Sequence, residues 1–307
     1  MTQLFDLSLL AAGLRTATPI LLAALGGLFT EQAGVLNIAL EGIMLSGAFT
    51  AVAVNYFSGS WLLGVLAAVL MGLLTAWILA VFILKLNATE VIVGMGINLF
   101  ASGLTAFLLR TMWTDKSELA QGLVALPRLN IPGLAKIPIL GPLFSGHSLL
   151  VYVALAMVFV THFVIYRTRL GLRIRAVGKN AEATASVGID TLKLRYIAAC
   201  LSGALCGLAG AHLSLGMLTM FTDNMTAGRG FMALAVIYFG DAKPYMVALG
   251  AILFGCAEAL SMRLQSLGLP SHFIIMIPYV FTVIALIAMS INKKKVRPAK
   301  PAAEGAK

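Results

Sequence analysis

Long apolar runs alternate with short polar breaks along almost the whole chain. Most of these runs are close to the roughly 20 residues that an α-helix needs to cross a bilayer. Because lipid offers no hydrogen-bond partners for backbone N–H and C=O groups, spanning segments of this kind are expected to be helices. The pattern therefore predicts an all-α, polytopic integral membrane protein. The predicted spans are 4–30, 38–57, 61–84, 88–109, 148–165, 196–220, 245–262 and 270–291.

The first run leaves two interpretations open, because it contains Arg15 and Pro19. It is either one span or an interfacial helix that bends at the proline into a span. A second uncertainty is the apolar piece near 231–240, which has only about half the length of a span. This piece either crosses the membrane or re-enters on the same side. The chain is therefore predicted to have a total of eight to ten transmembrane helices.

Two polar breaks are followed by short, glycine-flanked apolar segments, one in each half of the chain. NIALEGIMLSGAF (37–49) follows the break at 31–37, and GRGFMALAVIYFG (228–240) begins within the break at 221–230. Transporters often place broken helices at corresponding positions of their two halves. The similarity between the two segments is too loose to establish a repeat, but it predicts broken or re-entrant helices at these places.

Basic residues concentrate in a polar island at 166–195 and in the tail at 293–307. Each segment has a net charge of +5, so together they account for the net charge of +10. Lys and Arg in short loops mark the cytoplasmic side of a membrane protein. We therefore expect the island and the C-terminal tail in the cytoplasm. The loop at 110–147 contains four prolines and is more nearly balanced in charge, so we expect it outside.

The island also predicts a short helix of about two turns at 181–187. Asn180 is a good N-cap residue and Gly188 a good residue just beyond a helix end. The segment between them has no Pro or Gly, and its side chains are mostly small. A helix this short is not stable alone. Two interpretations remain open: a smooth helix that sits in a groove of another protein, and a solvated connecting loop.

Composition places the whole chain, 1–307, in a single transmembrane domain. Apolar residues make up 60% and charged residues 11%, and the mean hydropathy is +0.96. An ordinary soluble domain is about one-quarter charged. The basic charge does not indicate nucleic-acid binding, because it sits at two membrane-flanking segments.

Motifs for catalysis, metal binding and cofactors are not recognisable. The nearest match to a phosphate-binding loop, RIRAVGKN (173–180), lacks the leading glycine and the Ser/Thr that would reach Mg²⁺. The four histidines and three cysteines are scattered without metal-ligand spacing. We therefore expect no enzymatic activity, no metal and no cofactor in this chain.

Polar residues inside the predicted spans are candidates for a solute path, because buried ionisable groups in membranes are costly and tend to be functional. Glu41 and Glu258 are the two deepest acids, and Arg263 is expected to neutralise Glu258 from five residues away. Glu41 has no obvious local partner. For both acids, a structural role in a hydrogen bond to a neighbouring helix is slightly favoured over contact with the solute. Asn37 and Asn98 suit a neutral polar solute, but Asn98 is equally suited to joining two helices.

Three motifs in this order resemble the membrane permeases of bacterial ABC importers for simple sugars and nucleosides. They are NIALEGIMLSGAF (37–49), GLRIRAVGKNAEATASVGID (171–190) and AGRGFMALAVIYFG (227–240). The sequences of the first and third motifs are most similar to those of the nucleoside branch. The resemblance implies a permease in the bacterial cytoplasmic membrane, surrounded by lipid, in which the helix at 181–187 docks on a separate cytoplasmic ATPase.

The resemblance also implies partners and site residues. The pore would form between two permease subunits, identical or different, and an extracytoplasmic binding protein would deliver a nucleoside or sugar. The ATPase-coupling residues would be Gly178, Asn180, Ala181, Glu182, Ala183, Thr184, Ala185 and Gly188. The solute path would pass Asn37, Glu41, Asn98, Gly228 and Gly230.

Three alternatives remain at this stage. An ion-gradient-driven secondary transporter would need paired, titrating carboxylates in the membrane. A branched-chain amino-acid ABC permease would need charges along its path for a zwitterionic solute, which neutral asparagines mildly disfavour. A membrane scaffold without a solute path would not co-purify with an ATPase.

Overall fold

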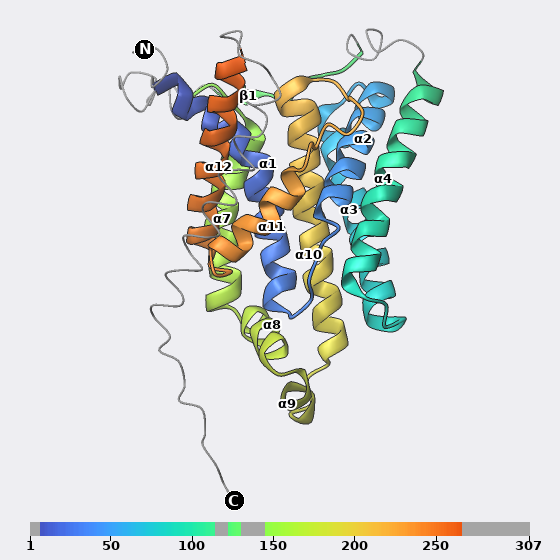
Figure 1. The fold of residues 1–307 in the computed structure, drawn as a ribbon, viewed down its shortest axis with the longest axis vertical. Helices are drawn as coiled ribbons and strands as arrows, with labels where there is room; N and C mark the ends of the chain where they lie inside the picture. Colours follow the sequence, from blue (N-terminus) through green and yellow to red (C-terminus); the bar gives the residue numbers. More distant parts are fainter. Residues whose placement is uncertain (1–6, 114–121, 130–144, 266–307) are drawn as a thin grey trace, which may run out of the picture.

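The computed structural model describes residues 7–113, 122–129 and 145–265, and these ranges are almost entirely helical (Figure 1). Within them, seven helices are long and apolar enough to cross a membrane. They are α1 (Leu7–Gln32), α2 (Leu40–Ser58), α3 (Trp61–Ala80) with the π-helix η2 (Val81–Lys85), α4 (Glu90–Met112), α7 (Leu149–Arg167), α10 (Thr191–Ala211) with the π-helix η3 (His212–Leu218), and α12 (Pro244–Gln265). The all-α, polytopic membrane fold is confirmed. The predicted span 270–291 and the tail 293–307 lie outside the described residues.

The shorter elements lie between these helices. They are α8 (Arg169–Lys179), α9 (Ala181–Ser186), α11 (Arg229–Phe239) and the two-residue strands β1 (Arg128–Leu129) and β2 (His147–Ser148). The strands pair antiparallel, with Arg128 opposite Ser148. Helices α8 and α9 extend from one end of the bundle, which we call the α9 end (Figure 1).

Helices α1 and α10 form the centre of the bundle. α1 packs chiefly against α12 and α10, and α10 chiefly against α3, α1 and α2. α1 is one continuous helix with Pro19 inside it, and its length and composition fit a single span. Transmembrane helices tolerate an internal proline because neighbouring groups can satisfy the freed carbonyl.

Glycines allow α3 and α10 to approach backbone to backbone. A Cβ atom added at Gly207 would lie 2.3 Å from the carbonyl oxygen of Ala68, and one added at Gly203 would lie 2.2 Å from that of Gly72. Membrane helices gain little from hydrophobic association, because lipid is as apolar as leucine, and depend instead on close packing of small residues. The α3–α10 interface has this character.

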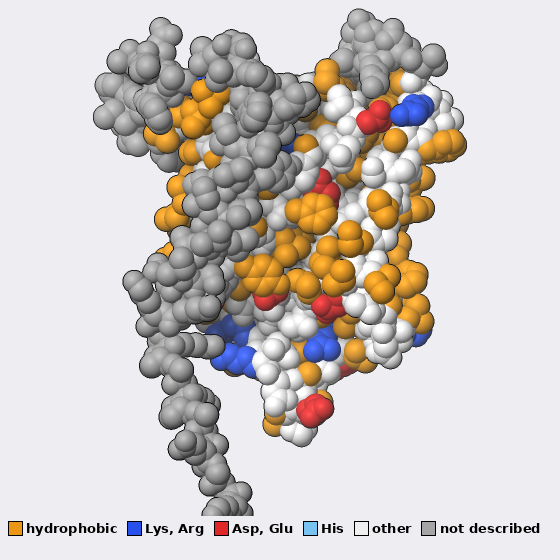
Figure 2. Space-filling view, in the orientation of Figure 1, with side chains coloured by type: hydrophobic (Ala, Val, Ile, Leu, Met, Phe, Trp, Pro, Cys, Tyr) orange, Lys and Arg blue, Asp and Glu red, His pale blue; other side chains and the backbone are white. Residues whose placement is uncertain are grey.

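Helix α4 lies at the edge of the bundle, and only 17% of its spanning window is buried. Its outward face carries large apolar side chains such as Ile92, Leu99 and Phe107. Figure 2 shows apolar side chains over this flank of the molecule. An apolar surface of this extent indicates contact with lipid or with another membrane protein.

Helices α2 and α11 both begin inside the body of the protein (Figure 1). α2 follows a non-helical linker, residues 33–39, that leaves the end of α1, and α11 follows the loop 219–228. With 11 residues, α11 is about 16 Å long, roughly half the thickness of the hydrocarbon core. The predicted interruptions are therefore present in both halves of the chain. After its interruption α2 still has 19 residues, enough for a span, whereas α11 is short.

The loop 219–228 and α11 together return the chain to the α9 end. The side-chain amide of Gln32, at the end of α1, donates to the carbonyl of Ala242, in the turn between α11 and α12 (3.0 Å). This turn therefore lies beside the end of α1. The loop 219–228 and α11 together therefore span the bundle, although α11 alone is too short to do so.

Candidate functional site

Helix α9 forms at the predicted place and with the predicted caps. It covers Ala181–Ser186, against the expected 181–187. The side-chain oxygen of Asn180 accepts from the backbone N–H of Ala183 (3.0 Å), and Gly188 has a φ of +80°, which favours glycine. The hydroxyl of Thr184 donates to the Asn180 carbonyl (2.7 Å) and its side chain faces the body.

The outer face of α9 is small and smooth. Glu182, Ala183, Ala185 and Ser186 are exposed, while Ala181 is half-buried. Just after the helix, Val187 exposes 71% of its surface at the tip of the protein. A single exposed apolar side chain is common on protein surfaces, so Val187 alone does not define a contact surface. The sequence-based prediction placed Val187 inside the helix, but did not count it among the residues of the small, exposed face.

Helix α8 connects this tip to the body and was not predicted as a separate helix. Thr168 caps it by accepting from the N–H of Gly171 (3.2 Å). Its buried positions are Gly171, Ile174 and Val177, so one narrow apolar face packs on the bundle. Arg169 and Arg173 are exposed, whereas the guanidinium of Arg175 lies over the ring of Tyr166, 5.0 Å from its centroid. In the sequence, the many basic residues of the island made this short apolar periodicity difficult to recognise.

Gly178, near the end of α8, contacts the linker 33–39 directly. A Cβ atom at Gly178 would lie 2.2 Å from the carbonyl oxygen of Gln32 and 3.0 Å from the backbone nitrogen of Gly34. Only glycine fits here. Arg195, at the start of α10, also reaches the linker, because its Nε donates to the carbonyl of Ala33 (3.4 Å).

The starts of α2 and α11 meet inside the bundle, and Glu41 joins them. The buried carboxylate of Glu41 accepts from the backbone N–H of Gly228 (2.7 Å) and of Gly230 (2.5 Å). The first N–H groups of a helix have no partner within the helix and lie at the positive end of its dipole, so a carboxylate is favoured there. Glu41 therefore has a partner, although it lies far away in the sequence.

Glu258 pairs with Arg229, not with Arg263 as expected. The Arg229 guanidinium forms a buried ion pair with the Glu258 carboxylate and also donates to the carbonyls of Met225 (3.0 Å) and Thr226 (3.3 Å). Arg263 instead donates to the hydroxyl of Ser8. Proximity along one helix was misleading, because the partner comes from another helix. An arginine between two glycines at the start of an apolar segment was the available signal.

The side chains of Asn98 and Asn37 also hold this junction together through hydrogen bonds. Asn98 Oδ1 accepts from the N–H of Gly42 (2.7 Å) and its Nδ2 donates to the carbonyl of Ile38 (3.0 Å), so it fastens α4 to the start of α2. Asn37 donates to Ser202 Oγ (3.0 Å) on α10 and accepts from the N–H of Ala39 (3.0 Å). The residues expected along the solute path thus gather around one junction of broken helices.

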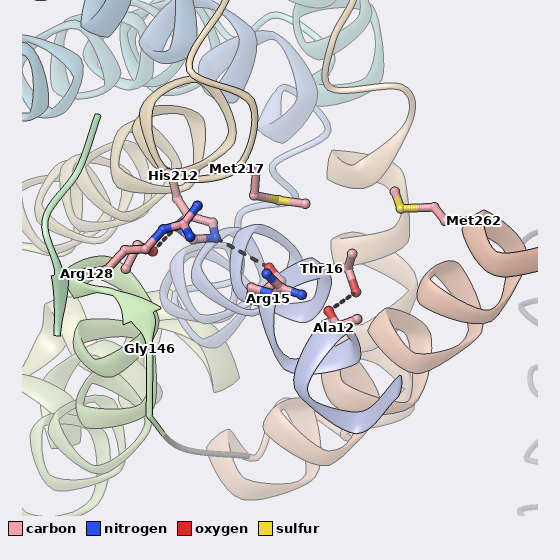
Figure 3. Close-up of a pocket in the computed structure, with 10 residues that line it drawn as sticks. Ala12, Arg15, Thr16, Arg128, Gly146, His212, Met217 and Met262 are labelled. Atoms are coloured by element: carbon pink, nitrogen blue, oxygen red, sulfur yellow. Dashed lines mark hydrogen bonds between the residues drawn. The ribbon is translucent and has the colours of Figure 1, made fainter. Parts of the chain in front are cut away.

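A separate cavity of about 170 Å³ opens at the other end of the bundle (Figure 3). Arg15 and Arg128 line it, together with His212 from η3. The His212 ring lies 3.3 Å from Ser148 Oγ and 3.4 Å from the Arg15 carbonyl, so it is packed between elements. Among the described residues, no group of three or more His, Cys, Asp or Glu could hold a metal ion.

Broken helices that meet within a multi-pass bundle, and a short helix presented at one end, define a membrane transport protein of the permease class. The chain belongs to the family described as branched-chain amino acid transport system / permease component, whose model matches residues 9–291. Members of this class are transport components and not catalysts.

Three relatives of this chain are named as ABC transporter permeases. The guanosine permease protein NupQ of Bacillus subtilis is 36% identical over 281 residues, 88% of each chain. The nucleoside permease protein NupC of Lactococcus lactis subsp. cremoris is 33% identical, again over 88% of each. The glucose permease protein TsgB13 of Haloferax volcanii is 30% identical over 78% of this chain and 65% of its own.

A solved structure supports the fold. An ABC transporter assigned to the metal-chelate type, in an inward-facing conformation, aligns with 90% of this chain and 85% of its own, with a TM-score of 0.50 and 15% identity. At this identity the likeness concerns the fold alone.

Proposed function

We propose that the chain is the permease subunit of an ATP-driven importer of nucleosides, and that α9 docks on a separate cytoplasmic ATPase. The α9 end and the C-terminal tail would then face the cytoplasm, with the loop at 110–147 outside. The whole chain, 1–307, would act as one transmembrane domain in the bacterial cytoplasmic membrane.

The observation that carries this proposal is the geometry of α9. The helix is too short to be stable by itself, yet it is capped at both ends and the side chain of Thr184 is buried against the body. Its exposed face is small, and Val187 adds one apolar side chain at the tip. A rigid, smooth projection transmits force better than a solvated loop does.

The solute assignment rests on the relatives and on the polar junction. Two of the three relatives described above are named for guanosine or nucleosides. Nucleosides are neutral and polar, and Asn37 and Asn98 make the junction polar without adding net charge, although both amides already bond to neighbouring protein groups. The proposal includes a second permease subunit, which would cover part of the apolar surface, and an extracytoplasmic binding protein that delivers the solute.

In the proposed cycle, ATP binding closes the ATPase pair and moves α9 as a lever. The permease then passes between outward-open and inward-open states. The loaded binding protein must favour one of these states, because a ligand shifts an equilibrium only through its differential affinity. Chemistry takes place on the ATPase, and this chain supplies the path and the lever.

The substitution Ala183→Trp tests docking, because Ala183 is exposed and a larger side chain there need not disturb the fold. We expect the variant to insert normally, to lose the co-purifying ATPase, and to lose uptake of labelled guanosine. The matched control is Ser58→Trp, at an exposed position on the opposite end, which should keep the ATPase. Full uptake and ATPase retention by Ala183→Trp would refute docking through α9.

The side of the membrane is tested by labelling a cysteine at the tip. In Val187→Cys, a membrane-impermeant maleimide should react in inverted vesicles and not in right-side-out vesicles. Ser58→Cys should show the reverse pattern, and the parent chain gives the background from its three native cysteines. Labelling of position 187 in right-side-out vesicles would overturn the proposed orientation.

A further inference from the structure

The linker 33–39 touches the helix that leads to α9. Gly34 has a φ of +71°, and a Cβ atom there would lie 3.2 Å from Cα of Gly178 on α8. In return, Gly178 packs so closely on Gln32 and Gly34 that no side chain fits between them. Backbone therefore lies directly on backbone, and a displacement of α8 toward the linker cannot be absorbed by a rotating side chain.

The same linker leads without a break into the start of α2. Asn37 fixes its middle to α10 through Ser202 (3.0 Å), and Asn98 holds its last turn to α4 through the carbonyl of Ile38 (3.0 Å). A Cβ atom at Gly94 would lie 2.8 Å from Cβ of Ile38, so α4 also packs closely on this turn. The linker is thus held from several sides between the α9 end and the junction.

Glu41 then joins α2 to α11. Besides the two hydrogen bonds to its carboxylate, the backbones themselves touch, because a Cβ atom at Gly230 would lie 2.4 Å from the nitrogen of Glu41. Charge-assisted bonds from backbone N–H groups to a buried carboxylate are short and strong. The first turns of the two broken helices are therefore held as one unit.

We propose that the linker 33–39 transmits movement of α8 and α9 to the junction of α2 and α11, with Glu41 as the positioning residue that makes α11 follow α2. This inference rests on the proposed function, because it assumes that α9 is moved by an ATPase. It assigns Glu41 to energy coupling and not to contact with the solute.

Glu41→Gln tests the positioning role in the complete complex, reconstituted with ATPase, second permease and binding protein. Glutamine has nearly the same shape, but its NH₂ group cannot accept, so one of the two N–H groups of α11 loses its partner. We expect normal ATPase docking and continued hydrolysis, while guanosine taken up per ATP hydrolysed falls by about tenfold. A purely structural role would lower the yield of complex and leave this ratio unchanged.

Two glycine variants test the linker contact with a matched control. Gly34→Ala and Gly59→Ala place alanine at similar positive φ angles, +71° and +64°, so the backbone strain is comparable. Only Gly34 has α8 against it, since nothing lies within 4 Å of a Cβ at Gly59. We expect Gly34→Ala to lower the ratio of uptake to hydrolysis and Gly59→Ala to leave it unchanged.

The outcomes separate this inference from the proposed function. If the wild-type complex shows no ATP-dependent uptake, the proposed function fails. If the wild type is active and both Glu41→Gln and Gly34→Ala keep the wild-type ratio, the function stands and the transmission route is wrong. A fall in the ratio for Gly59→Ala equal to that for Gly34→Ala would also overturn the route, because strain alone would then explain it.

Discussion

The buried ion pair between Arg229 and Glu258 gives the sharpest prediction about stability. Both side chains are about nine-tenths buried, at 10% and 12% exposure. Within a bilayer-spanning bundle, removal of one partner leaves an uncompensated charge with no water to solvate it. We therefore predict that Arg229→Met strongly destabilises the protein.

The structure also predicts an order among the variants. Arg229 has two further acceptors, the carbonyls of Met225 and Thr226. Among the described residues, the second oxygen of Glu258 has no hydrogen-bond partner. Arg229→Met should therefore lower the free energy of unfolding by about 3–5 kcal/mol, the usual cost of removing one partner of a buried pair. Glu258→Gln should lower it by less. The double variant Arg229→Met/Glu258→Leu should recover most of this loss, since it leaves no unpaired charge.

The assay is thermal unfolding of the purified protein in detergent. At roughly 2 °C or more per kcal/mol for a chain of this size, Arg229→Met should lower Tm by about 6 °C or more. The matched control is Lys243→Met, which removes the cation from an exposed pair with Asp241 (3.8 Å, 61% exposure on each side) and should change stability by about 1 kcal/mol or less. Equal effects of Arg229→Met and Lys243→Met would refute the reasoning.

Further predictions concern packing, the junction and the cap of α9. Gly207→Leu should prevent α3 and α10 from packing and abolish folded protein, measured as monodisperse yield, whereas Gly103→Leu, where nothing lies within 4 Å of a Cβ atom, should not. Asn98→Leu should cost about 1–3 kcal/mol by leaving a buried N–H and C=O without their partner, measured as a fall in Tm. Asn180→Ala should weaken the cap of α9 by about 1 kcal/mol and reduce ATPase binding in a pull-down without lowering the Tm of the body.

Local features of the sequence predicted the spans and the projecting helix well. Span boundaries depend on runs of apolar residues, so α2, α3, α4, α7 and α12 begin within three residues of the predicted positions. The caps of α9 depend on Asn180 and Gly188, which act within one turn. Such signals are contained in a few adjacent residues and need no tertiary information.

The contacts of the junction were not predictable, because they join distant parts of the chain. Glu41 and its partners Gly228 and Gly230 are separated by 187 and 189 positions. Glu258 was paired with Arg263 because it was near in sequence, whereas packing of α11 against α12 brings Arg229 to it. One sequence cannot reveal which helices lie side by side.

Helix α8 was missed for a different reason. Its buried face consists of Gly171, Ile174 and Val177, a narrow stripe among arginines. The net charge drew attention to the side of the membrane and away from the periodicity. The contact between Gly178 and Gly34 follows from this helix, so it was missed as well.

Uptake of labelled guanosine into proteoliposomes tests the central claim most directly. The vesicles would contain the chain with its ATPase, second permease and binding protein, with ATP on the ATPase side and ionophores that collapse proton and sodium gradients. We predict that uptake continues with the ionophores and stops when ATP is replaced by a non-hydrolysable analogue. Uptake that follows an imposed ion gradient and does not depend on ATP would contradict the account.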